Sequence, residues 1–178
     1  MSESSRRHKA EAPNRLGFAI IVVSTSRFET LKLMKHVDDP SGDLIVQLLE
    51  KAGHKIVYKV LIPDDRGLIG QKMSEVLSLN EVDAIITCGG TGIAPSDVTI
   101  ETIRPMLTKT LPGFGELFRK LSFEEIGSAA LLSRAIAGVA DGKAVFCLPG
   151  SPQAVRLCVE KLILSEAGHI VKHAREKA

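Results

Sequence analysis

Hydrophobic and polar residues follow one another along the chain in a pattern that predicts buried strands alternating with helices. Short apolar runs rich in β-branched residues are typical of strands covered on both faces. We expect such strands over 16–24, 55–62, 83–87 and 143–148. Apolar residues at helical spacing predict helices over 41–52, 66–79, 99–107, 116–121, 124–127, 128–134 and 153–166. Residues 25–40 show neither period and are expected to form a polar loop.

This order of elements indicates an α/β fold. We find no hairpin signal between the predicted strands, so we expect a three-layer α/β/α domain with a mostly parallel sheet. The chain shows no internal repeat or linker. We therefore predict a flexible N-terminal tail over 1–15, a single domain over 16–172 and a frayed C-terminus over 173–178.

Composition and charge narrow the classes of function. The formal net charge of +2 resides in residues 1–15, which hold four basic and two acidic side chains, and the rest of the chain is neutral. Nucleic-acid binding usually requires a clustered basic face, so this distribution argues against it. The three cysteines show no C-x-x-C spacing, which argues against disulfides and zinc. With no apolar run of about 18 residues and a polar N-terminus, we expect a cytoplasmic protein away from membranes.

Small and acidic residues follow every predicted strand. In an open parallel sheet, ligands bind where the strands end, so these turns should meet in one site. The turns are Ser24-Thr25-Ser26, Pro63-Asp64-Asp65, Gly89-Gly90-Thr91-Gly92 with Asp97 beyond it, and Pro149-Gly150-Ser151-Pro152. Glycine turns let backbone N–H groups approach an anion, and we expect the G-G-T-G turn to bind phosphate. The alternative is a tight turn that only needs positive φ angles.

Two acids in these turns predict a magnesium site. Taken singly, Asp64 reads as a turn residue and Asp97 as a helix N-cap. Together, beside a phosphate site, they suggest Mg²⁺ held against a nucleotide, because this ion takes one or two carboxylates plus phosphate oxygens. Ser24 and Ser151 are either hydroxyl donors to a second anion or helix caps. The five histidines are interpreted as scattered, without metal-ligand spacing.

Five motifs, in this order, carry a family resemblance. They are D-A-I-I-T-C-G-G-T-G at 83–92, D-V-T at 97–99, L-P-G-F-G-E at 111–116, L-S-R-A at 132–135 and L-P-G-S-P at 148–152. In these motifs the chain resembles molybdenum-cofactor biosynthesis proteins of the MoaB/MogA type, and within that group the MoaB proteins. The resemblance extends from about Gly17 to Lys172.

The resemblance implies a homotrimer or a hexamer that adenylylates molybdopterin with Mg-ATP and releases pyrophosphate before a metal-insertion partner acts. By likeness, Asp64 and Asp97 are the catalytic and Mg²⁺-binding acids. The other residues that the resemblance places against molybdopterin or ATP are Ser24, Thr25, Gly89, Gly90, Thr91, Gly92, Glu116, Pro149, Gly150 and Ser151.

The chain departs from the family pattern at two positions. Thr25 stands where an acid is common, and Ser96 where an arginine commonly precedes the second catalytic acid. These changes favour one alternative, a non-catalytic molybdopterin-binding protein, whereas retention of Asp64 and Asp97 favours the enzyme. Two further alternatives are a hydrolase or nucleotide-binding protein of the competence-damage type on the same fold, and a nucleic-acid binder acting through the basic tail.

Overall fold

The computed structural model describes residues 12–34 and 36–176. Its strands are β1 (Gly17–Val23), β2 (Lys55–Ile62), β3 (Ala84–Cys88), β4 (Lys109–Thr110), β5 (Ile136–Ala140) and β6 (Lys143–Leu148). Its α-helices are α2 (Thr25–Met34), α3 (Pro40–Lys51), α4 (Arg66–Ser78), α5 (Thr99–Ile103), α6 (Pro112–Ile126), α7 (Pro152–Cys158) and α8 (Leu164–Ala174). Short 3₁₀ segments span Arg104–Met106 and Gly127–Leu132, and a π-helical turn, Val159–Ile163, joins α7 to α8.

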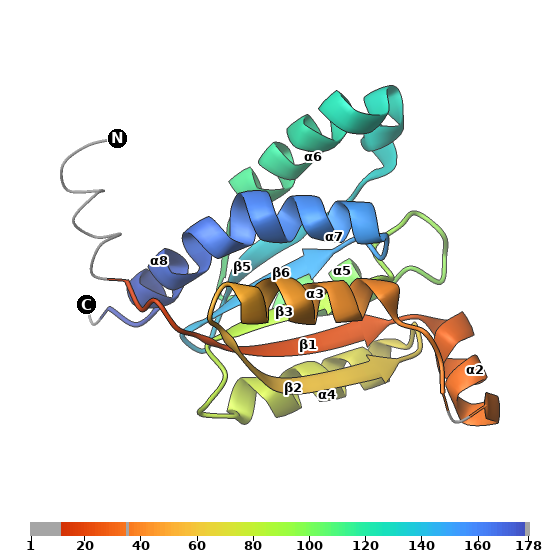
Figure 1. The fold of residues 1–178 in the computed structure, drawn as a ribbon, viewed down its shortest axis with the longest axis horizontal. Helices are drawn as coiled ribbons and strands as arrows, with labels where there is room; N and C mark the ends of the chain where they lie inside the picture. Colours follow the sequence, from red (N-terminus) through yellow and green to blue (C-terminus); the bar gives the residue numbers. More distant parts are fainter. Residues whose placement is uncertain (1–11, 35, 177–178) are drawn as a thin grey trace.

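The six strands form one sheet in the order β2-β1-β3-β6-β5-β4 (Figure 1). β2, β1, β3 and β6 are parallel, and β5 and β4 add an antiparallel edge. The predicted α/β fold with a mostly parallel sheet is therefore confirmed. Because the four parallel strands end at the same edge, the turns that follow β1, β2, β3 and β6 lie together there.

The residues of β1 alternate between two hydrophobic cores. Phe18, Ile20 and Val22 pack in a cluster with residues of α3, α6, α7 and α8. Ala19, Ile21 and Val23 pack in a second cluster with residues of α4 and α5. The sheet is thus covered on both faces, which gives the three layers expected from strands that are mostly apolar.

The predicted loop over 25–40 is wrong, because α2 occupies much of it. None of the residues of α2 is buried. A helix that lies outside the core needs no apolar face, so hydrophobic periodicity gives no sign of it. The helix after it also starts one residue earlier than expected, since Asp39 is the N-cap of α3 and Pro40 is its first residue.

The expectation of no hairpin is also wrong. β5 and β6 are joined by the two-residue turn Asp141-Gly142, whose φ angles are 48° and 71°. Positive φ at both positions is the signature of a type I′ turn, for which Asp-Gly is a favoured pair. The sequence therefore contained this signal.

The last helical segments are longer than the pattern predicted. α6 runs without a break over the two short helices expected between 116 and 127, and in Figure 1 it extends away from the sheet. The final helix continues through the π-helical turn to Ala174 instead of ending near Glu166. Within residues 12–34 and 36–176, no helix is long and apolar enough to cross a membrane.

The predicted division into tail, domain and C-terminus remains a prediction. Most of the tail, residues 1–11, lies outside the described residues, as do residues 177–178. Of the predicted C-terminal segment, His173 and Ala174 belong to α8. Arg175 forms a 2.7 Å ion pair with Asp83.

Candidate functional site

A cavity of about 750 Å³ opens where the parallel strands end. The residues around it come from the turns after β1, β2, β3 and β6 and from the segment before β5. They are Val23, Ser24, Thr25, Ser26, Arg27, Asp64, Gly89, Gly90, Thr91, Gly92, Ser96, Asp97, Leu132, Ser133, Arg134, Pro149 and Gly150. The turns that the sequence pattern singled out therefore meet in one place.

The glycine turn is both a tight turn with positive φ angles and a candidate anion-binding site. Gly89 and Gly90 have φ angles of 106° and 61°, which L side chains rarely adopt. A Cβ atom on Gly89 would overlap the carbonyl oxygen of Val23, and one on Gly90 would lie 2.6 Å from Asp64 Oδ1. Among the described residues, the N–H groups of Gly90, Thr91 and Gly92 have no hydrogen-bond acceptor. The turn needs glycine for its shape, and it leaves donors that an anion can bind.

Asp64 is held in the cavity wall by Thr25. The N–H and the hydroxyl of Thr25 both donate to Asp64 Oδ2 at 2.9 Å, and the N–H of Asp64 donates to Thr25 Oγ1 at 3.0 Å. Asp64 Oδ1 has no hydrogen-bond partner in the described part of the chain. The adjacent Asp65, not Asp64, is the N-cap of α4 and accepts from the N–H of Leu68. One oxygen of Asp64 is therefore fixed, and the other is available to a ligand.

Asp97 is oriented within the loop that follows the glycine turn. Its Oδ2 atom accepts from the N–H of Ala94 at 2.8 Å and lies 2.6 Å from where a Cβ atom of Gly92 would be. The alternative interpretation of Asp97 as a helix N-cap is wrong, because Val98 is the N-cap of α5 and has no side-chain hydrogen bond. Asp64 and Asp97 thus flank the glycine turn, one at Gly90 and the other at Gly92.

Arg134 is a cavity residue to which the sequence analysis gave no role. Its Nε atom donates to the carbonyl of Thr91 at 2.9 Å, and its Nη1 and Nη2 atoms lie 2.7 and 3.4 Å from the two carboxylate oxygens of Glu101. The hydrogen bond from Arg134 lowers the pKa of Glu101, although partial burial opposes this effect. A guanidinium held on two sides in this way is pre-positioned for an anion. In the sequence, the L-S-R-A motif at 132–135 could have pointed to this arginine.

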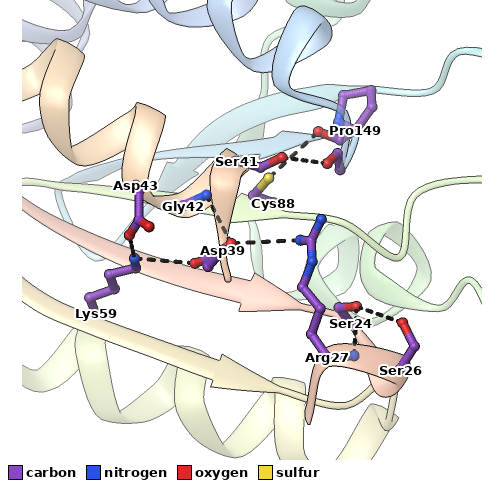
Figure 2. Close-up of polar contacts among 11 residues, drawn as sticks. Ser24, Ser26, Arg27, Asp39, Ser41, Gly42, Asp43, Lys59, Cys88 and Pro149 are labelled. Carbon is purple, nitrogen blue, oxygen red and sulfur yellow. Dashed lines mark hydrogen bonds and ion pairs between the residues drawn. The ribbon is translucent and has the colours of Figure 1, made fainter. Parts of the chain in front are cut away.

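Arg27 brings a second cation to the cavity from the first turn of α2. Its Nη1 atom lies 3.6 Å from Asp39 Oδ1, and Asp39 also accepts from the N–H of Gly42 and pairs with Lys59 (Figure 2). Burial acts to lower the pKa of Lys59, but its hydrogen bonds to Asp43 and Asp39 outweigh this and raise it. The network joins α2 and α3 to the sheet beside the cavity.

The start of α3 also fixes the turn after β6. Ser41 Oγ donates to the carbonyl of Gly150 at 2.7 Å, and the Cys88 thiol donates to that of Pro149 at 3.6 Å (Figure 2). Burial raises the pKa of the Cys88 thiol to about 12. Cys88 is therefore an unreactive packing residue, and the turn is anchored from two sides.

Two predicted site residues lie outside the main cavity. Glu116 lines a neighbouring cavity of about 270 Å³, together with Arg104 and Arg119, and Arg134 lies between the two cavities. Ser151 lines a third cavity and caps α7 through the N–H of Ala154 at 3.2 Å.

Ser24 lies within the main cavity and also serves as a cap. Its carbonyl accepts from the N–H of Phe28 at 3.0 Å, and its hydroxyl accepts from that of Arg27 at 3.5 Å. Ser24 and Ser151 therefore both act as helix caps, and the structure leaves open whether their hydroxyls also bind a ligand.

The donor set fits Mg²⁺ only as part of a complex with phosphate. Among residues 12–34 and 36–176, no group of three or more histidine, cysteine or acidic residues is arranged to hold a metal ion. Asp64 and Asp97 supply two carboxylates beside free backbone donors, a set that suits an ion arriving with phosphate oxygens and water. The described residues of this cavity therefore do not form a metal centre from protein ligands alone.

Comparison with known proteins identifies the family. A family model described as a probable molybdopterin binding domain matches residues 19–169. The chain belongs to this molybdopterin-binding family. Molybdenum cofactor biosynthesis protein B of Bacillus subtilis (strain 168) is 43% identical over 174 residues, which cover 97% of this chain and 98% of that protein. Molybdopterin adenylyltransferase of Pyrococcus furiosus is 42% identical over 173 residues, which cover 95% and 97% of the two chains.

Solved structures agree with this assignment. The crystal structure of a molybdenum cofactor biosynthesis protein B superposes with a TM-score of 0.85 at 43% identity and covers 94% of this chain and 100% of that one. The resemblance to MoaB/MogA-type proteins is thus confirmed. Membership of this family makes molybdopterin the ligand against which the geometry of the cavity is considered below.

Proposed function

We propose that this chain is a molybdopterin adenylyltransferase of molybdenum cofactor biosynthesis, with Mg-ATP as its second substrate. One observation carries the proposal: two fixed carboxylates, Asp64 and Asp97, flank a glycine turn whose N–H groups are free to bind an anion. Relatives that carry the name molybdopterin adenylyltransferase support the same reaction.

The chemistry asks little of the protein beyond position and charge. An oxygen of the pterin's terminal phosphate attacks the α-phosphorus of ATP, the bond between the α-phosphorus and the bridging oxygen breaks, and pyrophosphate leaves with that oxygen. The attacking phosphate is already ionised at neutral pH, so no strong general base is needed. In-line placement and neutralisation of charge supply the rate enhancement.

Each part of the cavity then has a role. The N–H groups of Gly90, Thr91 and Gly92 bind phosphate oxygens, and Arg27 and Arg134 add positive charge at the two sides of the cavity. Asp64 and Asp97 are the residues that would hold Mg²⁺, which when bound neutralises the charge on the transferred group. Ser96 stands where an arginine is common, and Arg134 supplies a cation that is bonded directly to the glycine turn at Thr91.

Adenylyl transfer in vitro tests this proposal. Protein, molybdopterin, ATP and Mg²⁺ are mixed, and the adenylylated product is followed by chromatography. We expect Asp64→Ala and Asp97→Ala to lower kcat by about 10²–10³-fold each, in line with the loss of a charge-stabilising group.

Asp65→Ala is the matched control. Asp65 neighbours Asp64 and caps α4 but does not line the cavity, so this variant should cost about 1 kcal/mol of stability and keep its activity. Absence of product from the native chain, with molybdopterin still bound tightly, would favour the non-catalytic binding protein, which the threonine at 25 and the serine at 96 also favour.

We also propose that the protein works as a homotrimer. Large apolar side chains are exposed on α6 and the 3₁₀ segment after it, where Leu117, Phe123, Ile126, Leu131 and Leu132 are between 45% and 84% exposed. Such a surface is typical of an interface, and Leu132 also lines the main cavity. Light scattering on the native chain and on Leu131→Glu tests this. A monomeric native chain would contradict it, whereas a trimer lost in the variant would support it.

A further inference from the structure

The cavity of about 270 Å³ beside the main one is rich in arginine. It lies between the start of α6, the start of β5 and the end of α5 with the 3₁₀ segment after it. Arg104, Arg119 and Arg134 line it, and Glu116 is the one acid among its described lining residues. Of these four side chains, the adenylyl transfer described above uses only Arg134, so the cavity has charges that still need an explanation.

Two of the three arginines have no acid partner. Arg134 pairs with Glu101 at 2.7 Å. Within the part of the chain that the structure describes, neither Arg104 nor Arg119 forms an ion pair or a side-chain hydrogen bond, and Glu116 forms none either. The cavity therefore has an excess of positive charge, even when Glu101 is counted against Arg134.

A glycine allows the guanidinium of Arg119 to lie beside the cavity. Gly115 is one helical turn before Arg119 on α6 and is buried. A Cβ atom at Gly115 would lie 2.6 Å from the carbonyl oxygen of Ala135 and 3.2 Å from Arg119 Nη1. The missing side chain thus lets α6 approach the segment before β5 and lets the guanidinium lie over the first turns of the helix, close to that segment.

The walls between the charges are apolar. Ile100, Ala135 and Ala137 line the cavity and are at most 3% exposed. A cavity with low-dielectric walls and an excess of one charge concentrates the electric field and attracts ions of the opposite sign. Because guanidinium groups bind phosphate oxygens through pairs of parallel N–H groups, the class of ligand that suits this cavity is a compact anion with several phosphate oxygens.

Arg134 connects this cavity to the main one. It lines both, and its Nε atom donates to the carbonyl of Thr91 in the glycine turn at 2.9 Å. A phosphate bound at the glycine turn and an anion in the second cavity would therefore lie on either side of one guanidinium. In the reaction proposed above, the group that stands next to the α-phosphate, and that leaves, is a diphosphate.

We propose that the second cavity binds a diphosphate group through Arg104, Arg119 and Arg134. The inference rests on the proposed function for the source of the ligand, which is either the β- and γ-phosphates of bound ATP or free pyrophosphate. A volume of about 270 Å³ holds such a group with part of its hydration, since one water takes up about 30 Å³. The departing charge would then be received by side chains that do not bind the transferred group.

Calorimetric titration of the full chain with sodium pyrophosphate, at low salt and without Mg²⁺, tests the site. We expect Arg104→Gln and Arg119→Gln each to weaken binding by about tenfold, because each removes charged hydrogen-bond donors. Both residues are exposed, so the variants should fold. Lys120→Gln is the matched control, since it removes the same charge from the next position of α6 but does not line the cavity.

Glu116 gives the test a second sign. Its carboxylate repels an anion in the cavity, so Glu116→Gln should tighten the binding of pyrophosphate, by up to about fivefold for a pair of exposed charges. If Glu116 instead contributed to binding, the same change would weaken it. Weaker binding in Glu116→Gln would overturn the site.

Nucleotides distinguish the two sources of the diphosphate group. If the phosphates of bound ATP occupy the cavity, Arg119→Gln should weaken a non-hydrolysable ATP analogue by about tenfold and leave AMP, which lacks those phosphates, unchanged. If only free pyrophosphate enters, both nucleotides keep their affinity and the site still stands.

Binding and activity can fail separately. These titrations need no adenylyl transfer, so a native chain that binds pyrophosphate but forms no product would leave the site standing. Equal affinity for pyrophosphate in Arg104→Gln, Arg119→Gln and Lys120→Gln, or no binding of pyrophosphate by the native chain, would overturn the site even if adenylyl transfer is intact.

Discussion

Charged residues of the same types have different roles at the two edges of the sheet, the edge where the parallel strands begin and the edge where they end. Where the parallel strands begin, Asp83 uses both carboxylate oxygens within the protein: one accepts from the N–H of Gly17 at 2.7 Å, and the other pairs with Arg175 at 2.7 Å. Where the strands end, Asp64 uses one oxygen within the protein and leaves the other facing the cavity. A carboxylate that is satisfied on both sides stabilises the fold, whereas one that is satisfied on one side is oriented for a ligand.

Lysine and arginine show the same contrast. Lys143, which begins β6, is buried, and its ammonium group donates to the carbonyls of Leu79 and Val82. Burial, and secondarily the charge of Arg175, lower the pKa of Lys143. Arg134, at the other edge, is fixed by Thr91 and Glu101 but remains open to the cavity. Position along the strand therefore separates structural from functional charges better than residue type does.

The largest difference between the two edges should appear when one glycine at each edge is replaced by alanine. Gly90 and Gly142 both have positive φ, 61° and 71°, so each substitution carries a similar backbone cost of about 1–2 kcal/mol. Only at Gly90 would the new methyl group collide with Asp64 and Thr99. We expect Gly90→Ala to lower kcat/KM by about 100-fold or more, because small displacements of positioning groups have effects of that size. Gly142→Ala should lose stability alone, and equal activity losses in the two variants would contradict the comparison.

Replacement of Lys143 should show that charged residues where the parallel strands begin contribute to stability and not to activity. In Lys143→Met, one buried and one partly buried carbonyl lose their donor, and we expect the free energy of unfolding to fall by about 1–3 kcal/mol with kcat unchanged. Lys59→Met is the control, since Lys59 is a partly exposed lysine paired with Asp39 and Asp43 and should lose less than about 1 kcal/mol. Urea unfolding measures both.

Neutralising Glu101 should produce a smaller effect on activity. Glu101→Gln removes the charge that holds Arg134, and we expect kcat/KM to fall by about tenfold, the equivalent of about 1.4 kcal/mol. Glu160→Gln removes a comparable ion pair, with Arg156, on the helical segment after β6, away from the cavity. Activity should survive that change, and a loss as large as that of Glu101→Gln would count against a specific role for Arg134.

The pH dependence of stability should show the smallest effect, through His54. Burial lowers the pKa of His54, whose Nδ1 atom accepts from the N–H of Leu16 at 3.2 Å. The unfolded chain therefore binds this proton more readily, and His54 makes the protein less stable as the pH falls below about 6.5, its unfolded value. His54→Asn should flatten this part of the curve relative to the native chain. Thermal unfolding between pH 5 and pH 8 measures the difference.

The fold was predictable as far as it depends on burial. The strands of the parallel core are mostly apolar, and their positions agree with the sequence pattern to within a few residues. α2 was missed because it buries no residue, and β4 because a two-residue edge strand has no pattern of its own. The hairpin between β5 and β6 was overlooked despite its Asp141-Gly142 turn.

The site was predictable where glycines and acids follow strands. That rule brought Asp64, Asp97 and the glycine turn together, because parallel strands end at one edge. It gave no role to Arg134, which precedes β5 and reaches the cavity only through the packing of the antiparallel edge. Glu116 belongs to a neighbouring cavity between the start of α6 and β5, and no local pattern predicts how a helix packs against a strand.

The exposed helix α2 has a consequence for the energetics of binding. Its described attachments to the rest of the protein are concentrated in its first turn, where Thr25 bonds Asp64 and Arg27 pairs with Asp39. A helix without buried residues opens locally at a small fraction of the free energy needed to unfold the sheet. Since Thr25 is the first residue of α2 and fixes Asp64, an opening of α2 that includes this residue also releases the carboxylate. By thermodynamic linkage, a ligand that binds the oriented carboxylate slows hydrogen exchange at the start of α2, although most of that helix lies outside the cavity.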